Sequence, residues 1–242
     1  MNKVYIIQMS DHDTSVARAD VCEESVKEFM VDPDITRFEA TQPADINKHV
    51  METFGKIVPW TWAQDHFTEG LDLRTGLYKR MYQATDQRRV VACGLSHFRL
   101  WKECVKRQEC ITILEHDAKL IRPFDPADLQ GTFWGAVGLN DPRGNTRKGT
   151  KFHSIVEQYG EGIHRVPVID EPTEPPLPMG LAGHSAYVIT PDFAERILAE
   201  IEVTGMWPND AIMCRQLFPR DLKVVYPYYT VVQAGISTTT GI

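Results

Sequence analysis

The sequence predicts an α/β protein whose mostly parallel central sheet is flanked by helices. The first observation is the order of elements, because strand-like and helix-like segments alternate from the start of the chain. The second is the character of the strand-like segments, which are short, apolar and rich in β-branched residues, as buried strands are. The third is composition, since 242 residues with 43% hydrophobic and 24% charged residues suit one sizeable core.

The opening of the chain predicts the order strand, helix, strand, helix. Residues 4–9 form an apolar run with aromatic and β-branched side chains that predicts a strand, and residues 35–40 predict a second strand. Between them, residues 15–30 carry apolar side chains at spacings compatible with a helix, and the Asp-Pro-Asp sequence at 32–34 ends it. Residues 46–54 predict a short second helix. This alternation favours parallel pairing of the first strands.

The rest of the chain predicts further strands and helices without a clear domain boundary, so we expect a single domain over residues 1–242. Residues 140–180 are rich in Gly and Pro and predict a loop, for which a mobile lid is one interpretation. The predicted helices cover residues 90–105, 191–201 and 209–217, and the predicted strands cover residues 111–114, 133–139, 186–189, 224–227 and 230–232.

The charge balance argues against a general affinity for nucleic acid or anionic lipid, because the formal net charge is −7. A local basic and aromatic stretch from Arg74 to Arg89 could still bind a nucleic acid strand, although a solvated face explains it equally simply. No run of 18 apolar residues suggests a membrane span, and the first residues do not resemble a signal peptide.

The cysteine pattern predicts a reducing, cytoplasmic location. The chain has five cysteines, an odd number, and no CxxC pair. We expect no zinc site, because this interpretation finds no Cys or His residues with the close paired spacing that structural zinc sites use.

The segment Glu115-His116-Asp117 is the strongest local indication of chemistry. It follows the apolar strand 111–114 directly, and ligands of open α/β sheets bind at the carboxyl ends of strands. Because alternate residues of an extended segment point the same way, Glu115 and Asp117 can converge on one site. Paired carboxylates suit Mg²⁺ or Mn²⁺, with His116 as a further candidate ligand. A turn or a helix cap is the simpler alternative.

Four segments in order resemble glycosyltransferase family 25, which includes lipooligosaccharide galactosyltransferases and collagen-modifying galactosyltransferases. The sequence CGLSHFRLW at 93–101 resembles the family's "GCALSH…LW" helix, and ILEHDA at 113–118 resembles its "LEDDA" metal motif. The segment 183–198, around AYVIT, resembles the family's "aYlIs…A…L" pattern. Pro208 and Asp210 resemble the family's late "P-x-D" positions, and Tyr226-Pro227, Gln233 and Ser237 resemble its "P…Q…S" positions.

Two positions depart from the family pattern. His116 stands where the family usually has Asp, which could weaken metal binding or add an imidazole ligand. Residues 88–92 lack the usual "GE-x-G" lead, which bears on the acceptor contacts more than on the fold.

The resemblance implies a GT-A-like fold and a hexosyl- or pentosyltransferase that uses a nucleotide sugar, with UDP as the expected nucleotide and Mn²⁺ or Mg²⁺ as cofactor. It implies a nucleotide-sugar-binding half at about residues 1–120 and an acceptor-side half at about 121–242. The donor-binding candidates are Gln8, Ser10, Arg18, Ser96, His97 and Glu115.

Position in the predicted elements supports these donor candidates. Gln8 and Ser10 lie at the end of the first strand, and Arg18 lies on the first helix, from which it could reach a phosphate. Ser96 and His97 are expected near a helix start, where backbone N–H groups favour anions. The alternative for Gln8 and Ser10 is a plain turn, and for Arg18 it is a surface charge. For His97 it is a buried histidine bonded to a backbone carbonyl.

Asp210 is the candidate general base, because family members that invert the anomeric centre need a carboxylate to take the acceptor hydroxyl's proton. A helix N-cap is the alternative role for Asp210. His184 and Trp207 are candidates for the acceptor side. Trp207, like Trp60 and Trp62, could stack on a sugar or a base, with core packing as the alternative.

Three functions therefore remain open. The first is transfer to a hydroxyl of a glycan or lipooligosaccharide acceptor. The second is transfer to a hydroxylated base in phage DNA, held through residues 74–89. The third is a non-catalytic nucleotide-sugar-binding protein on the same scaffold, because a fold does not prove activity.

Overall fold

A seven-stranded mixed sheet forms the centre of the computed structural model, which describes residues 2–129, 135–143, 148–169 and 175–234. The strands follow the order β2-β1-β5-β9-β7-β10-β8 across the sheet. Their bounds are β1 (Asn2–Gln8), β2 (Pro33–Glu39), β5 (Ile111–Glu115), β7 (Ala136–Gly138), β8 (Gly162–Arg165), β9 (Ala186–Ile189) and β10 (Leu222–Tyr226).

The α/β class is confirmed, and the sheet is mixed, with five of its seven strands running in one direction. Strand β1 pairs in parallel with β2 and β5, and β7 pairs in parallel with β10. Strand β9 runs antiparallel to both β5 and β7, and β8 runs antiparallel to β10. Strand direction depends on how the connections cross the sheet, and the apolar pattern of a strand is the same in either direction.

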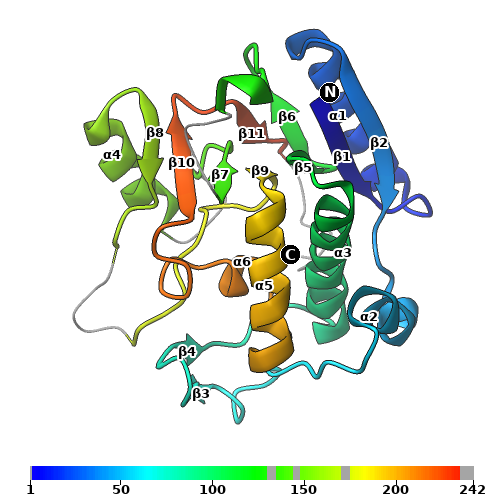
Figure 1. Cartoon of the computed structure of the whole chain (residues 1–242), viewed down its shortest axis with the longest axis vertical. Coiled ribbons are helices and arrows are strands. Elements are labelled where there is room, and N and C mark those ends of the chain that lie inside the picture. Colours follow the sequence, from blue (N-terminus) through cyan, green and yellow to red (C-terminus); the bar gives the residue numbers. More distant parts are fainter. Residues whose placement is uncertain (1, 130–134, 144–147, 170–174, 235–242) are drawn as a thin grey trace.

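Helices cover both faces of this sheet, and α3 and α5 lie side by side on one of them (Figure 1). The helices are α1 (Asp13–Phe29), α2 (Ile46–Phe54), α3 (Gln87–Arg107), α4 (Gly149–Tyr159), α5 (Pro191–Thr204) and α6 (Asn209–Ile212), with 3₁₀ turns η1 (Pro43–Asp45) and η2 (Pro126–Leu129). None of the described helices is long and apolar enough to cross a membrane.

The alternation of side chains along β1 explains the two-sided packing. Val4 and Ile6 belong to the apolar cluster that includes the buried side chains of α1, whereas Tyr5 and Ile7 belong to the cluster that includes α3 and α5. All four side chains are buried. Successive residues of a strand point to opposite faces, so a strand buried on both faces is apolar at every position.

The predicted opening of the chain is confirmed, since β1, α1, β2 and α2 occur in that order. The predicted loop at 140–180 is wrong in part, because it contains α4 and β8. Helix α4 places Phe152 and Val156 four residues apart in the core, and this pair is enough to hold a short helix among flanking glycines. The central part of the suggested lid, residues 170–174, lies outside the described residues.

Two predicted helix boundaries also change. Helix α3 begins at Gln87 rather than at residue 90, because the Asp86 side chain accepts a hydrogen bond from the backbone N–H of Arg88 and caps the helix. The helix predicted at 209–217 ends at Ile212, where the backbone leaves helical geometry at Met213.

Two small two-stranded sheets complete the described fold. Strands β3 (Gly70–Leu71) and β4 (Tyr78–Lys79) form a hairpin. Strand β11 (Thr230–Val232) pairs antiparallel with β6 (Ala118–Leu120). The second pairing brings the end of the described chain back beside the segment that follows β5.

Candidate functional site

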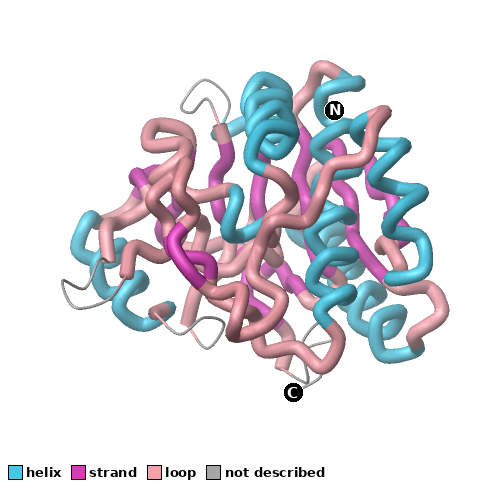
Figure 2. Tube along the Cα trace, turned by 90° about the horizontal axis from the view of Figure 1, so that it is seen from below, coloured by secondary structure: helices cyan, strands magenta, loops and turns pink. Residues whose placement is uncertain are grey.

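The candidate site lies at the carboxyl ends of the parallel strands β1 and β5. Ile7 of β1 is paired with Glu115, the last residue of β5, so the two strands end together. Figure 2 views the molecule from below, the end at which many connecting loops lie. The position is the one that the sequence predicts, because ligands of α/β sheets bind where strands end and loops begin.

Glu115 is held by a buried network that begins on α3. Nε2 of His97 lies 3.2 Å from Oε1 of Glu115, and Nδ1 of His97 lies 2.8 Å from the Tyr187 hydroxyl. Trp101 donates its indole N–H to the same hydroxyl at 2.8 Å. The network is satisfied when Tyr187 donates to Nδ1 and the imidazole donates from Nε2 to the carboxylate. The side chains of His97, Trp101 and Tyr187 are fully buried, so the orientation of His97 is fixed.

This network keeps Glu115 ionised. Burial alone raises the pKa of its carboxyl group, but the interaction with His97 outweighs burial, so the pKa lies below its ordinary value. The side chain of Glu115 remains 29% exposed. A charged oxygen ligand is therefore present at the end of β5 and accessible from outside.

Asp117 differs from Glu115, because its surroundings favour the protonated carboxyl group. Burial and the charge of Glu115 raise the pKa of Asp117 to about 7. Its Oδ1 atom is buried and has no hydrogen-bond partner among the described residues. A divalent cation between the two carboxylates would relieve this repulsion and give Oδ1 a partner. The residues present thus fit Mg²⁺ or Mn²⁺, both of which bind carboxylate oxygens.

His116 lies between these carboxylates in sequence and is buried. Burial lowers its pKa, so the imidazole is neutral, as a metal ligand must be. Its Nε2 atom is buried without a hydrogen-bond partner in the described part of the chain. Its role as a third ligand stays a prediction.

The C-terminal strand β11 leads into Gln233, which closes over this segment. The backbone N–H of Gln233 donates to the Asp117 carbonyl at 2.8 Å. Its side-chain amide lies 3.1 to 3.3 Å from the carbonyls of Arg18, His116 and Ala118. One amide thus ties α1 to the acidic segment, which fixes the backbone around Asp117.

The donor candidates near β1 are already engaged in protein contacts. The side-chain oxygen of Gln8 accepts a hydrogen bond from Arg37 at 2.8 Å. Arg18 donates to the carbonyl of Ala234 at 3.1 Å, and Ser10 is exposed in the loop after β1. Arg18 and Ser10 therefore lie on the edge of the site, whereas Gln8 would have to exchange its protein partner to bind a donor.

The expectation that Ser96 and His97 begin a helix is wrong. They lie in the third turn of α3, so their backbone N–H groups do not form an anion site. Ser96 is buried, and its hydroxyl donates to the Ala92 carbonyl and accepts from the Thr41 N–H. Ser96 thus positions the chain after β2, whereas His97 reaches the site through its side chain.

Asp210 lies in the first turn of α6 and approaches the site from a different element. Pro208 occupies the N-cap position, and no side chain caps the helix, so the N-cap alternative for Asp210 does not hold. Instead, the Tyr82 hydroxyl donates to Oδ1 of Asp210 at 2.6 Å. Burial, with a smaller contribution from Glu115, raises the pKa of Asp210. Tyr82 was not predicted as a site residue, because it lies in an irregular segment before α3.

Gly180 allows the chain to pass close behind α6. A Cβ atom at this position would lie 2.2 Å from the Met213 carbonyl oxygen and 3.1 Å from the Asp210 carbonyl oxygen. Backbone atoms cannot move aside as a flexible side chain can, so only glycine fits here without displacing the Asp210 segment.

We therefore expect Gly180→Ala to destabilise the protein by about 1–3 kcal/mol through steric overlap. The matched control is Gly70→Ala, because a Cβ atom at Gly70 meets no atom within 4 Å. Urea unfolding of the two variants and the wild type gives the comparison. Equal unfolding free energies for Gly180→Ala and Gly70→Ala would show that the close approach has no energetic consequence.

His184 lies close to His97 and Glu115 in the same polar cluster. Burial, with a smaller contribution from the neighbouring His97, lowers its pKa to about 3, so the imidazole is neutral. Its Nε2 atom lies 3.3 Å from the Met213 sulfur, and its buried Nδ1 atom has no partner among the described residues. A buried neutral imidazole with one unpartnered nitrogen beside Glu115 can bind a ligand hydroxyl or a cation.

Trp207 does not support the predicted stacking role. Its side chain is fully buried, its indole N–H donates to the Thr61 hydroxyl at 3.0 Å, and its ring packs against Trp62 at 5.1 Å. Trp62 is also buried, and its N–H donates to the Arg80 carbonyl. The core-packing alternative holds for both residues, because no face of either ring is open to a sugar.

Cys93 is a site residue that the sequence interpretation did not select. Its sulfur, one ring nitrogen of His97 and one carboxylate oxygen of Glu115 all lie within 4.8 Å of one another. Cys93 and His97 are four residues apart on α3, so they share a face of the helix. This spacing was visible in the sequence, but its meaning depends on Glu115, which lies on another element.

The basic stretch 74–89 is largely neutralised within the protein. Arg74 pairs with Glu200, Lys79 with Asp72, and Arg88 with Asp86. These pairs reduce the positive charge that a nucleic acid strand could use.

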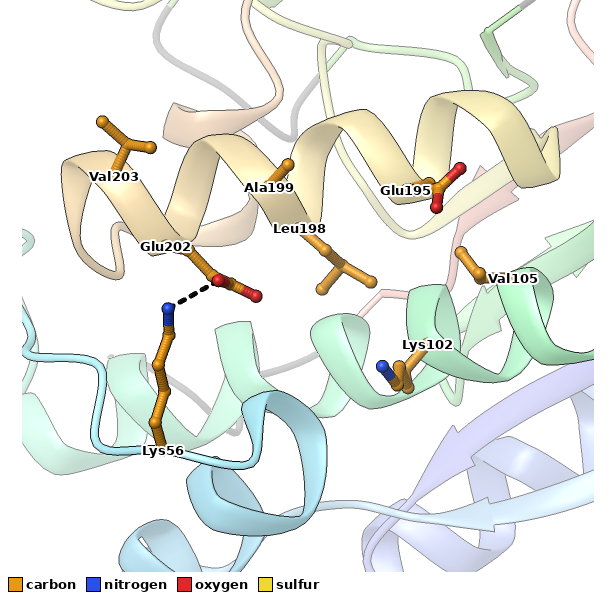
Figure 3. A pocket seen from close by; sticks show the side chains of 8 residues that line it. All are labelled: Lys56, Lys102, Val105, Glu195, Leu198, Ala199, Glu202 and Val203. Carbon is orange, nitrogen blue, oxygen red and sulfur yellow. Dashed lines mark ion pairs between the residues drawn. The ribbon is translucent and has the colours of Figure 1, made fainter.

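A surface groove of about 510 Å³ lies away from this chemistry. Figure 3 shows it between α3 and α5, with a Lys56–Glu202 ion pair at one side. None of the candidate site residues lines it. The groove therefore does not compete with the cluster around Glu115 as the candidate site.

Comparison with known proteins gives one family and distant structural likenesses. No curated protein matches the chain. Among solved structures, the apo form of mouse xyloside xylosyltransferase 1 is similar, with 8% sequence identity and a TM-score of 0.44 over 96% of this chain and 84% of that one. The family model described as "Glycosyltransferase family 25 (LPS biosynthesis protein)" matches residues 1–127, more than half of the chain, and covers α1, α3 and the acidic segment after β5. The chain belongs to glycosyltransferase family 25.

Proposed function

We propose that this glycosyltransferase moves a sugar from a UDP-sugar to a hydroxyl group of a glycan acceptor, with inversion and with a divalent metal. The observation that carries the proposal is the acidic pair at the end of β5. Glu115 is ionised and accessible, and Asp117 has a buried oxygen without a partner beside it. This arrangement is unfavourable for the protein alone and favourable with a bound cation.

Glu115 and Asp117 would hold Mn²⁺ or Mg²⁺, with His116 as the candidate third ligand. When bound, the metal neutralises the negative charge that grows on the nucleotide diphosphate as it leaves. The protein's own residues prepare this position. His97 orients the carboxylate of Glu115, and Gln233 fixes the backbone carbonyls on both sides of Asp117.

Asp210 would act as the general base. Inversion in one step requires a carboxylate on the acceptor side that takes the proton of the attacking hydroxyl. Its raised pKa makes Asp210 a stronger proton acceptor than an ordinary exposed aspartate. The hydrogen bond from Tyr82 occupies Oδ1 and orients the carboxylate, which leaves Oδ2 as the oxygen that takes the proton.

The remaining candidate residues fall in two halves of the domain, a nucleotide-sugar-binding half and an acceptor-side half, which the family implies. Ser10 and Arg18, at the carboxyl end of β1 and on α1, would contact the nucleotide in the half formed by about residues 1–120. His184 and Asp210 would serve the acceptor side in the half formed by about residues 121–242. A GT-A-like arrangement is the one that this division and the family favour.

Tyr82→Phe tests the role of Asp210 through pH dependence. The Tyr82 hydrogen bond lowers the pKa of Asp210, which burial has raised, so its loss should raise that pKa further. A base works only while ionised, so activity falls as pH drops through its pKa. We expect the acid limb of kcat to move upward by about one pH unit, given the usual strength of a hydrogen bond to a charged group.

The pH–rate profile of Tyr82→Phe is compared with that of Tyr159→Phe. Tyr159 is 49% exposed on α4 and takes no part in the site. If the acid limb stays in place in Tyr82→Phe, Tyr82 does not act through the ionisation of Asp210.

The overall proposal is tested by measuring UDP release from a panel of UDP-sugars, with and without Mn²⁺ and with simple glycan acceptors. We expect Mn²⁺-dependent release from one class of UDP-sugar and acceleration by an acceptor. Release from another nucleotide class would correct the nucleotide. Binding of a nucleotide sugar without any turnover would favour the non-catalytic alternative instead.

A hydroxylated base in phage DNA is the less supported acceptor. The ion pairs of Arg74, Lys79 and Arg88 use the charges that such an acceptor would need. Acceptor panels that include hydroxymethylated DNA separate the two classes directly.

A further inference from the structure

We propose that Cys93, His97 and Glu115 form a binding site for Zn²⁺ that differs from the oxygen-rich site of Mn²⁺ or Mg²⁺. The three ligand atoms come from two rigid elements, since Cys93 and His97 lie one turn apart on α3 and Glu115 ends β5. All three atoms lie within 4.8 Å of one another. This places the three residues around one point.

The spacing needs only a small adjustment for zinc. Zinc binds sulfur at about 2.3 Å and nitrogen or carboxylate oxygen at about 2.0–2.2 Å, so tetrahedral ligand atoms are separated by roughly 3.3–3.8 Å. Rotation about the side-chain bonds of Cys93 and Glu115 covers the remaining difference of about 1 Å. Neither helix α3 nor strand β5 has to move.

The ligand chemistry selects zinc over the harder cations. A thiolate and an imidazole favour Zn²⁺, whereas Mg²⁺ and Mn²⁺ prefer carboxylate, carbonyl and water oxygens. Three protein ligands with an open fourth position are typical of zinc sites that keep a bound water, rather than of four-ligand structural sites. This proposal departs from the sequence expectation of no zinc site, because Cys93 and His97 lie four residues apart and meet Glu115 only through the fold.

The surroundings of His97 are those of a metal ligand. With a metal on Nε2, the imidazole carries its proton on Nδ1 and donates it to the Tyr187 hydroxyl 2.8 Å away, which Trp101 fixes. The ring is held with Nε2 directed at Glu115, 3.2 Å away. Metal-binding imidazoles are commonly fixed in this way through their second nitrogen. Cys93 and Glu115 are only partly buried, so an ion can reach the cluster.

Because the zinc site and the proposed Mn²⁺ site would both use Glu115, zinc binding should affect catalysis. This step rests on the proposed function. Both ions would use the one carboxylate of Glu115, Zn²⁺ together with Cys93 and Mn²⁺ together with Asp117. Zn²⁺ bound by the thiolate should therefore compete with Mn²⁺-dependent donor binding and inhibit transfer.

Titration of the purified protein with Co²⁺, used as a spectroscopic substitute for Zn²⁺, tests the site. Thiolate ligation gives an intense charge-transfer absorption in the near ultraviolet, which oxygen and nitrogen ligands do not give. We expect this band to saturate at one equivalent of Co²⁺ and to disappear when Zn²⁺ displaces it. Absence of the band in the wild type would overturn the proposal without any variant.

Variants then identify the ligands. Cys93→Ser should abolish the band and weaken Zn²⁺ binding by more than the roughly 10- to 100-fold that the loss of an outer-shell partner costs. Cys110→Ser is the matched control, because Cys110 is also partly buried and lies outside the cluster. An unchanged band in Cys93→Ser, or its loss in Cys110→Ser, would contradict the assignment.

Asp117→Ala separates this proposal from the proposed function. The variant should keep the Co²⁺ band and Zn²⁺ affinity while it loses Mn²⁺-dependent UDP binding. A wild type that releases UDP from UDP-sugars but binds no zinc would refute the zinc site alone. A wild type that shows the thiolate band but turns over no nucleotide sugar would refute the proposed function alone.

Discussion

Asp117→Ala is expected to abolish Mn²⁺-dependent binding of UDP and of the UDP-sugar, and with it all measurable transfer. Asp117 supplies one of the two carboxylates at the end of β5, and its buried Oδ1 atom has no other partner in the described structure. Without it, Glu115 alone would have to hold the cation against water. Isothermal titration of UDP in the presence of Mn²⁺ measures the loss directly.

The isosteric variant Asp117→Asn distinguishes a metal ligand from a structural residue. Burial and the neighbouring Glu115 raise the pKa of Asp117, so its charge opposes folding of the metal-free protein. A raised pKa of this kind means that ionisation of Asp117 weakens the fold as pH rises through the range between its ordinary value and about 7. We expect Asp117→Asn to lose UDP binding and to be at least as stable as the wild type at neutral pH without metal.

The matched control for both variants is Asp128→Ala, because Asp128 is an exposed aspartate in η2. It should bind UDP as the wild type does. Retention of full Mn²⁺-dependent UDP binding by Asp117→Ala would remove Asp117 from the metal site.

Asp210→Asn is expected to lower kcat by about 10²- to 10⁴-fold while donor binding stays close to that of the wild type. Asparagine keeps an oxygen that can accept the Tyr82 hydrogen bond, so the local structure should survive. It cannot take a proton from the acceptor hydroxyl. The effect should therefore appear in kcat for transfer and not in the affinity for UDP.

Asp192→Asn is the control for this second variant, since Asp192 also lies in the first turn of a helix but is exposed. Steady-state kinetics of both variants with one donor and one acceptor provide the comparison. Near-normal kcat in Asp210→Asn would exclude Asp210 as the base, and weakened UDP binding in that variant would assign it to the donor side.

The architecture of the first half was predictable because its apolar patterns are local. Strand β1 is buried on both faces, and α1 follows it after a short polar turn, so the β–α–β–α order is visible in the sequence. The antiparallel direction of β9 and β8 was not visible, because a short apolar run reads the same in both directions. Helix α4 was missed because glycines bound a segment with only a few core contacts.

The candidate site was predictable where its residues are adjacent in sequence, and not where they meet only through the fold. Glu115 ends β5 and Asp117 follows two residues later in the turn before β6, so their nearness was visible in the sequence. The contacts of Tyr82 with Asp210 and of Cys93 with Glu115 join different elements. For Trp207 the sequence predicted a role that the fold excludes. The residue type suits stacking on a sugar, but the side chain is fully buried against Trp62.

The most direct measurement of the central claim is the Tm of the wild type and of Asp117→Ala against a panel of nucleotides, with and without Mn²⁺. A ligand that binds only the folded state stabilises it by about 2.7 kcal/mol when present at 100 times its Kd. A nucleotide site built on Glu115 and Asp117 predicts that UDP raises the Tm of the wild type only when Mn²⁺ is present, and that Asp117→Ala shows no rise. No rise with any nucleotide in the presence of Mn²⁺, or an equal rise in Asp117→Ala, would contradict it.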